Sequence, residues 1–232
     1  MSKQLRASLE HILAMPYYKN EAARSGTVVH GHEEALSDLL TSHGFNRVSD
    51  FKTNSYLGQA YLESNGQVWI SKNYPNLKPG SFITQPSGSN NFPDFLLQDF
   101  DGRYLLLEAK SGNGTSIAWN DNLPKPNVIY IFSSAKPNQT TIFLGQDVLD
   151  VRQETIIDVL RKNIDTLVRK ANSELMEADT KNRGWNFYPR PKFQQLQGRQ
   201  NGKSMLKIER VDYFKHANRI ACEQRALEFA DG

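Results

Sequence analysis

The sequence has a single cysteine, Cys222, among its 232 residues. One thiol cannot form an internal disulfide, and it cannot supply a zinc site of the finger or ribbon type. These absences argue against the disulfide-stapled secreted domains and the small zinc-bound modules. We therefore expect a protein of a reducing compartment, the cytoplasm.

Long hydrophobic runs are also missing from the sequence. Nowhere do about 18 apolar residues follow one another, as a membrane-spanning helix requires. Near the N-terminus a run of only four apolar residues precedes Pro16, and there is no small-residue cleavage signature. This pattern predicts an amphipathic helix and not a signal peptide, so we expect a soluble protein.

Neither sign of charge dominates the chain, which has 28 Lys and Arg residues, 25 Asp and Glu residues and a net charge of +3. A weakly basic balance is compatible with a polyanionic partner, but many ordinary enzymes share it. With 232 residues and 38% hydrophobic composition, the chain is long enough to bury a proper core. We predict one domain over residues 1–232.

The first third of the chain is predicted to contain packing helices and a β-rich region. Apolar residues at helical spacing predict helices over residues 5–13 and 34–43, with Gly44 as the C-cap of the second. Between residues 45 and 83, short alternating stretches are broken by Asn, Gly and Pro. Such a pattern is typical of hairpin strands and loops.

The middle of the chain predicts the centre of a sheet. Residues 92–98 and 103–111 are predicted as two strands joined by an Asp-Gly turn, and the nearly all-apolar stretch 127–134 as a strand buried on both faces. A long helix follows, with an apolar stripe from Ile157 to Leu175 that we expect to cover the sheet. The predicted fold class is therefore α/β, with a central mixed β-sheet flanked by helices.

The predicted hairpin carries three residues that can form a site. Pro93-Asp94 is followed, after thirteen intervening residues, by Glu108-Ala109-Lys110. Because side chains alternate along a strand with a period of two, Glu108 and Lys110 must project from the same face, and the hairpin can bring Asp94 back beside them. Two carboxylates and one ammonium are thus predicted to meet.

This trio suits the hydrolysis of a phosphodiester with the help of Mg²⁺. Asp94 and Glu108 would be the ligands of the ion, and the backbone carbonyl of Ala109 could be a further ligand. Lys110 would orient or help to deprotonate the attacking water, and its ammonium would stabilise the charge that develops at phosphorus.

The alternative to this catalytic interpretation is a surface hairpin with a solvated salt bridge. Against it stands the apolar run 104–107, which leads directly into Glu108. A strand that is so deeply buried should not end in charged residues without a use for them. The sequence therefore favours catalysis.

Pro93-Asp94 together with Glu108-x-Lys110 resembles the motif of the PD-(D/E)XK nuclease superfamily. The context strengthens the resemblance, because the motif falls on a predicted hairpin that is followed by a buried strand and a long helix, in the order that the family's core uses. The resemblance implies a restriction-endonuclease-like catalytic core over about residues 28–178. Residues 179–232 would then form a DNA-recognition or dimerisation subregion.

Two loops beside the motif resemble loops of type II restriction endonucleases. Residues 85–95 match the loop that precedes the catalytic aspartate and approaches the DNA groove, and residues 110–126 match the loop after the catalytic lysine. On this resemblance we list six candidates for DNA contact: Ser89, Asn90, Asn91, Ser111, Asn113 and Asn120. The alternative for residues 89–91 is a turn built from turn-forming residues.

The resemblance covers residues 85–134 and implies a Mg²⁺-dependent type II restriction endonuclease. Such an enzyme cuts double-stranded DNA at a short specific site and leaves 5′-phosphate and 3′-hydroxyl ends. A palindromic target is matched by a homodimer, and a cognate DNA methyltransferase is expected in the host without a stable complex. Two alternatives stay open: a structure-selective or repair nuclease with the same core, and a DNA-binding protein without catalysis.

An acidic residue from an earlier helix often lies near the metal in this family. Glu33 and Glu34 are the available candidates here, and we favour Glu34 slightly. The buried stripe is set by Leu36, Leu39 and Leu40, but which way the helix is rolled against the active face does not follow from the sequence.

Other residues have both a functional and a structural interpretation. His30 and His32 have no further ligand at zinc-like spacing, and we interpret them as helix-entry residues. Trp119 could stack on a base, although a tryptophan that packs its own loop is the commoner case. The segment 183–219 mixes basic, amide and aromatic residues, so it either reads base edges or makes only phosphate contacts.

Overall fold

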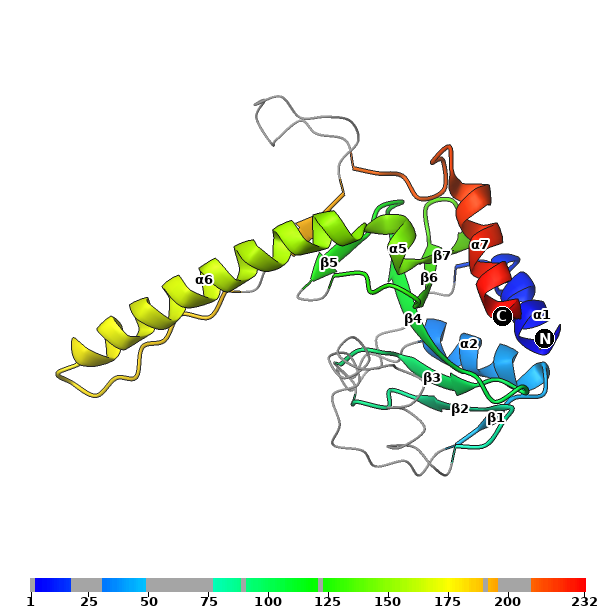
Figure 1. Ribbon diagram of the computed structural model, residues 1–232, viewed down its shortest axis with the longest axis horizontal. Helices are drawn as coiled ribbons and strands as arrows, with labels where there is room; N and C mark the ends of the chain where they lie inside the picture. Colours follow the sequence, from blue (N-terminus) through cyan, green and yellow to red (C-terminus); the bar gives the residue numbers. More distant parts are fainter. Residues whose placement is uncertain are drawn as a thin grey trace.

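The computed structural model describes residues 3–17, 31–48, 77–88, 91–120, 123–189, 192–195 and 210–232. Its centre is a mixed six-stranded sheet in the order β1-β2-β3-β4-β6-β7 (Figure 1). The strands are β1 (Asn46–Arg47), β2 (Ser81–Thr84), β3 (Phe95–Gln98), β4 (Tyr104–Gly112), β6 (Ile129–Ser134) and β7 (Gln139–Leu144). β1 and β2 pair in parallel, as do β4 and β6, and the other pairs are antiparallel. The predicted α/β class with a mixed sheet is confirmed.

The hairpin of β3 and β4 forms as the sequence predicts. Phe95 lies opposite Leu107 in the antiparallel pair. The turn is closed by the amide of Gly102, which donates to the carbonyl of Asp99 at 2.9 Å. Gly102 has a φ of +87°, a conformation that a residue without a Cβ adopts at no steric cost.

β6 is buried along its whole length, with all six of its residues buried. This confirms the predicted burial on both faces. Side chains of the sheet divide into two clusters by alternation. The first contains Leu97, Leu107 and Ile131, and the second contains Leu96, Leu106, Tyr130 and Phe132.

Three helices cover the first cluster: α1 (Lys3–Leu13), α2 (Gly31–Ser42) and α7 (Arg219–Asp231). Leu9 of α1, Leu40 of α2 and Ala226 of α7 belong to that cluster. Figure 1 shows α1 and α7 side by side, so that the two ends of the chain lie close together. The hydrophobic core therefore includes residues from both ends of the chain.

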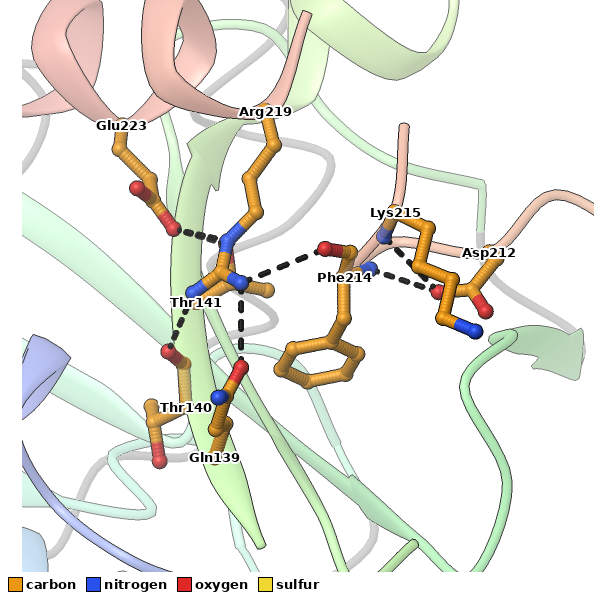
Figure 2. A network of polar contacts seen from close by, with 8 residues as sticks. All are labelled: Gln139, Thr140, Thr141, Asp212, Phe214, Lys215, Arg219 and Glu223. Atoms are coloured by element: carbon orange, nitrogen blue, oxygen red, sulfur yellow. Dashed lines mark hydrogen bonds and ion pairs between the residues drawn. The ribbon is translucent and has the colours of Figure 1, made fainter. Parts of the chain in front are cut away.

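A polar network joins α7 to the edge strand β7 (Figure 2). The Nε atom of Arg219 donates to Oε1 of Glu223 at 2.7 Å, and the hydroxyl of Thr141 donates to the same oxygen at 2.7 Å. Arg219 also donates from Nη1 to the side-chain oxygen of Gln139 at 3.2 Å and from Nη2 to the carbonyl of Thr140 at 3.4 Å. These contacts fix the first turn of α7 on the sheet.

The long helix α6 (Val151–Glu177) projects away from the sheet (Figure 1). Its N-cap is Asp150, whose side chain accepts from the amide of Gln153 at 2.8 Å. No residue of α6 is buried. The prediction that this helix covers the sheet is wrong, because α1, α2 and α7 occupy one face, and side chains that include Trp119 and Tyr213 pack on the other.

The remaining elements are short. α5 (Gly145–Val148) follows β7, and β5 (Ala118–Asn120) pairs with β8 (Lys192–Gln194) in a separate two-stranded sheet. Of the strands predicted between residues 45 and 83, β1 and β2 are present, and residues 49–76 lie outside the described part. None of the described helices is both long and apolar enough to cross a membrane.

Candidate active site

The register of the hairpin places Asp94 opposite Glu108. Phe95 and Leu107 are paired, so the next position outward on each strand pairs the two acidic residues. The amide of Asp94 donates to Oε2 of Glu108 at 3.2 Å. In return, the amide of Ala109 donates to Oδ2 of Asp94 at 2.8 Å. The predicted juxtaposition of the two carboxylates is therefore present.

Lys110 completes the predicted trio. It lies two residues beyond Glu108 on β4, hence on the same face, and its ammonium donates to Oε1 of Glu108 in an ion pair. The Glu108 side chain is only 11% exposed, whereas the Lys110 side chain is 30% exposed. The carboxylate is thus nearly covered, and the lysine side chain is the more exposed member of the pair.

The electrostatics of Asp94 show that the two carboxylates disturb each other. Burial, together with the charges of Glu108 and Glu33, raises the pKa of Asp94 to about 7, against the lowering effects of Lys110 and the Ala109 amide. Asp94 is half-buried. Like charges that are held together away from water favour a shared cation, because a cation removes both the repulsion and part of the desolvation cost.

The carboxylates of Asp94 and Glu108 are the groups of this site that could hold a metal ion. Asp94 Oδ1 accepts no hydrogen bond from the described residues. The carboxyl group to which this oxygen belongs faces Glu108. The described part of the chain contains no cluster of three or more His, Cys, Asp and Glu residues suited to a metal. Two carboxylates suit an ion that keeps most of its waters, as Mg²⁺ does.

Of the two acidic candidates on α2, Glu33 lies beside Asp94 and Glu34 points away from it. Glu33 accepts from Nε2 of Gln85 at 3.0 Å, and its charge acts on Asp94. Glu34 forms an ion pair with Arg47 at 2.7 Å, and its side chain is 57% exposed. The choice of Glu34 from the sequence is therefore corrected, because the packing of α2 turns Glu34 toward β1 and solvent.

The six candidates for DNA contact are placed unevenly. Ser89 and Asn90 lie outside the described residues, and for Asn120, the last residue of β5, the side chain also does. Ser111 and Asn113 are exposed just beyond Lys110. The side chain of Asn91 donates to the carbonyl of Ser87 at 2.8 Å. This contact agrees with the alternative of a self-contained turn, and the DNA contacts stay predictions.

Lys125 is a further cation beside the site that the sequence did not indicate. Its ammonium lies 5.4 Å from the ring centroid of Phe92, two residues before Asp94. Its amide donates to the hydroxyl of Tyr130 at 2.8 Å, and Tyr130 is paired with Glu108 between β6 and β4. The backbone of Lys125 is thus tied to the strand beside the carboxylates.

The charge of Lys125 is not neutralised by an ion pair with any described residue. Burial lowers the pKa of this ammonium, and the charges of Glu154, Arg161, Asp158 and Glu108 act on it from a distance. A half-buried ammonium without a direct acidic partner fits an anion that is supplied from outside the chain.

Three other residues singled out by the sequence, or lying in a segment that it singled out, pack inside the described structure: Trp119, His32 and Tyr213. Trp119 is 3% exposed and packs edge-on against Tyr130, with ring centroids 5.2 Å apart, so the packing interpretation is confirmed. His32 is buried in α2, and His30 lies outside the described residues. From the basic segment 183–219, Tyr213 packs on Phe132 of the core.

A pocket between β7 and α7 is a weaker candidate for a functional site. Its lining includes Thr141, Tyr213, Arg219 and Cys222, and none of the three predicted catalytic residues. Arg219 already forms an ion pair with Glu223, so its charge is neutralised within the described chain. The carboxylates of the hairpin are therefore the better candidate.

Comparisons of the chain with known protein families, with curated proteins and with solved structures found no match. The functional interpretation therefore rests on the residues and on the geometry described above.

Proposed function

We propose that this chain is a type II restriction endonuclease that hydrolyses double-stranded DNA at a short specific site and depends on Mg²⁺. One observation carries the proposal: Asp94 and Glu108 face each other across the β3–β4 hairpin, with Lys110 paired to Glu108 on the same face. The resemblance of these residues to the PD-(D/E)XK motif supports it. A restriction-endonuclease-like core is part of the proposal, as is a cytoplasmic location.

The residues of the trio have distinct roles in the proposed reaction. Asp94 and Glu108 would hold Mg²⁺, which when bound neutralises charge on the scissile phosphate. Lys110 is an ammonium that already donates to Glu108, so it orients the attacking water and stabilises negative charge at phosphorus. The water oxygen forms a bond to phosphorus, the bond to the 3′ oxygen breaks, and that oxygen takes up a proton. The products are a 5′-phosphate and a 3′-hydroxyl.

Two further residues support this chemistry from outside the trio. Glu33 lies close enough for its charge to act on Asp94, and we propose it as the second acid of the site. Lys125 is proposed to contact a DNA phosphate next to the scissile one, because its half-buried ammonium has no acidic partner in direct contact among the described residues. Glu33 would add a negative charge beside the metal ion, and Lys125 would add a positive charge beside the DNA phosphate.

Double-stranded DNA is the proposed partner, and a two-fold homodimer is the proposed functional form. Each protomer would cut one strand of a palindromic site. A host that carries such an enzyme would also need a methyltransferase of the same specificity, without any stable complex between the two proteins.

The first experiment is incubation of the purified chain with unmethylated bacteriophage and plasmid DNA in Mg²⁺, beside an EDTA control, followed by sequencing of the fragment ends. We expect discrete, Mg²⁺-dependent fragments that share one end sequence. Smeared products would favour a non-specific or structure-selective nuclease. An absence of cleavage with every divalent metal would contradict the proposal and favour a DNA-binding protein without catalysis.

The variants Lys110→Ala and Lys136→Ala provide a matched pair for this assay. Lys136 is an exposed lysine in the turn between β6 and β7. We expect Lys110→Ala to abolish cleavage while DNA binding in Ca²⁺ is retained, and Lys136→Ala to cleave normally. Equal activity of the two variants would remove Lys110 from the reaction.

A further inference from the structure

Most exposed large hydrophobic side chains of the described residues lie in one segment. Of thirteen such side chains, eleven fall within residues 151–188. They are Val151, Ile156, Val159, Leu160, Ile164, Leu167, Leu175, Met176, Trp185, Phe187 and Tyr188. We call residues 151–189 the arm, which consists of α6 and the segment that returns along it. A surface so rich in apolar side chains on one projecting element is typical of an interface.

The arm is held together by its own hydrogen bonds. The side chain of Asn172 donates to the carbonyl of Phe187 at 2.9 Å and accepts from its amide at 2.7 Å. At the tip, the amide of Gly184 donates to Asp179 at 2.7 Å. The returning segment therefore lies along one side of α6, as Figure 1 shows, and leaves another side open.

The open side of α6 carries a continuous apolar stripe. Ile156, Leu160, Ile164, Leu167 and Leu175 are all exposed, and their spacings of three, four or eight residues place them on one face of the helix. Leu160 is 51% exposed and Leu167 is 68% exposed. Side chains of this kind gain free energy when another apolar surface removes them from water.

We infer that the arm is the surface through which a second copy of this chain binds, with the two α6 helices packed antiparallel. Ile164 is the middle residue of α6 (Val151–Glu177). A two-fold axis through Ile164 therefore overlaps the two helices along their full length, and it places Leu160 of one copy beside Leu167 of the other. The stripe is complementary to itself.

The size of the stripe agrees with a stable dimer. The five side chains of the stripe contribute on the order of 500 Å² in each copy, taking roughly 100 Å² for each. A standard protein interface buries about 800 Å² of each partner, of which about 60% is apolar. The stripe therefore supplies about as much apolar surface as such an interface needs.

The charges of α6 favour a protein partner over DNA or a membrane. The helix has five Lys and Arg residues and five Asp and Glu residues. A surface that binds DNA needs an excess of positive charge, and a helix that lies on a membrane is rich in Lys and Arg on its polar face. A neutral helix with an apolar stripe fits another protein surface of the same character.

The homodimer is part of the proposed function, and to that extent this inference rests on it. The arm is defined by the exposure of its apolar side chains and by its internal hydrogen bonds, and neither depends on the proposed function. Its test measures the mass of the protein without DNA, so a failure of the dimer and a failure of cleavage are separate results.

The experiment is sedimentation equilibrium of the full chain at micromolar concentration. We expect the wild-type protein to have twice the protomer mass of 26.4 kDa, and the variant Leu160→Glu/Leu167→Glu to have the protomer mass. The matched control, Thr166→Glu/Ser173→Glu, adds the same charges to exposed positions on the opposite side of α6 and should stay dimeric. A monomeric wild type, or a dimeric Leu160→Glu/Leu167→Glu variant, would overturn the inference.

A cross-linking measurement keeps the inference testable if the charged variant misfolds. In a Cys222→Ser background, Ile164→Cys places one thiol on the proposed axis, opposite its own copy. Mild oxidation should give a covalent dimer of Ile164→Cys, whereas Thr166→Cys, on the other side of the helix, should stay monomeric in a denaturing gel. Equal cross-linking of both variants would contradict the proposed axis. A Leu160→Glu/Leu167→Glu variant that stays dimeric but no longer binds DNA would also contradict the inference, because the stripe would then contact DNA and not a second copy.

Discussion

At the scale of single residues, Asp94 is unfavourable for stability in the absence of a cation. Burial and the nearby Glu108 raise its pKa to about 7, whereas the same carboxyl in an unfolded chain titrates near pH 4. Between these values the folded chain holds a proton that the unfolded chain has released. The proton held by Asp94 therefore stabilises the folded chain fully below about pH 4, and this stabilisation is lost as the pH rises through about 7.

We expect Asp94→Asn to be more stable than the wild type at pH 8 in EDTA, by on the order of 2 kcal/mol. The neutral amide removes the repulsion with Glu108, and the difference should shrink toward pH 5. Addition of Mg²⁺ should stabilise the wild type and not the variant. Urea unfolding at both pH values measures these effects, with Asp38→Asn as an exposed control. A variant less stable than the wild type at pH 8 would contradict this account.

Lys125 leads to a prediction about DNA binding that is independent of turnover. In Ca²⁺, Lys125→Ala should weaken binding at every sequence and lower the slope of log affinity against log salt concentration by about one, because one phosphate contact is lost. Lys125→Arg should retain most of the binding. Fluorescence anisotropy at several salt concentrations measures the slope. An unchanged slope, equal to that of Lys136→Ala, would show that Lys125 contacts no phosphate.

His32 should make the protein less stable in mild acid. Burial lowers its pKa to about 4, and neither ring nitrogen has a hydrogen-bond partner among the described residues. The unfolded chain takes up a proton below about pH 6.5 and the folded chain does not, so stability falls from there to about pH 4. We expect His32→Leu to lose about 2 kcal/mol less than the wild type between pH 7.5 and pH 5. Urea unfolding measures this, and the exposed His216→Leu should behave as the wild type.

At the scale of elements, α7 depends on one buried carboxylate. Glu223 is 9% exposed and accepts from both Arg219 and Thr141. We expect Glu223→Ala to destabilise the fold by about 3 kcal/mol, because it leaves the half-buried Arg219 without its acidic partner. Thermal unfolding would measure the loss, and Glu228→Ala, on the exposed side of the same helix, should cost far less. Similar losses in both variants would mean that the network in Figure 2 does not stabilise α7.

The elements differ in how far the sequence predicted them. The hairpin of β3 and β4 was predicted correctly, because its turn and its alternation of side chains are local properties of residues 92–111. The long helix at 151–177 was also predicted, but its position was wrong. An apolar stripe identifies a face that needs a partner, and it does not say whether that partner is the helix's own sheet or another surface.

At the scale of the whole molecule, the candidate active site and the proposed interface lie on different elements. The candidate active site lies on the hairpin and the adjoining β6, and the arm projects from the same body (Figure 1). In the proposed dimer, two such bodies are joined through their arms, which leaves both hairpins free for DNA. The proposed dimer would therefore use side chains that the core does not, since α6 contributes no buried residue to the core.

The sequence by itself determined the trio of Asp94, Glu108 and Lys110, because strand alternation and a short hairpin are set by neighbouring residues. Only the tertiary structure decided the choice of Glu33 over Glu34, the place of Lys125 beside the carboxylates and the exposure of α6. These depend on how a helix is rolled and on which surfaces are already covered. Such properties are fixed by contacts between segments far apart in the chain, and no local pattern records them.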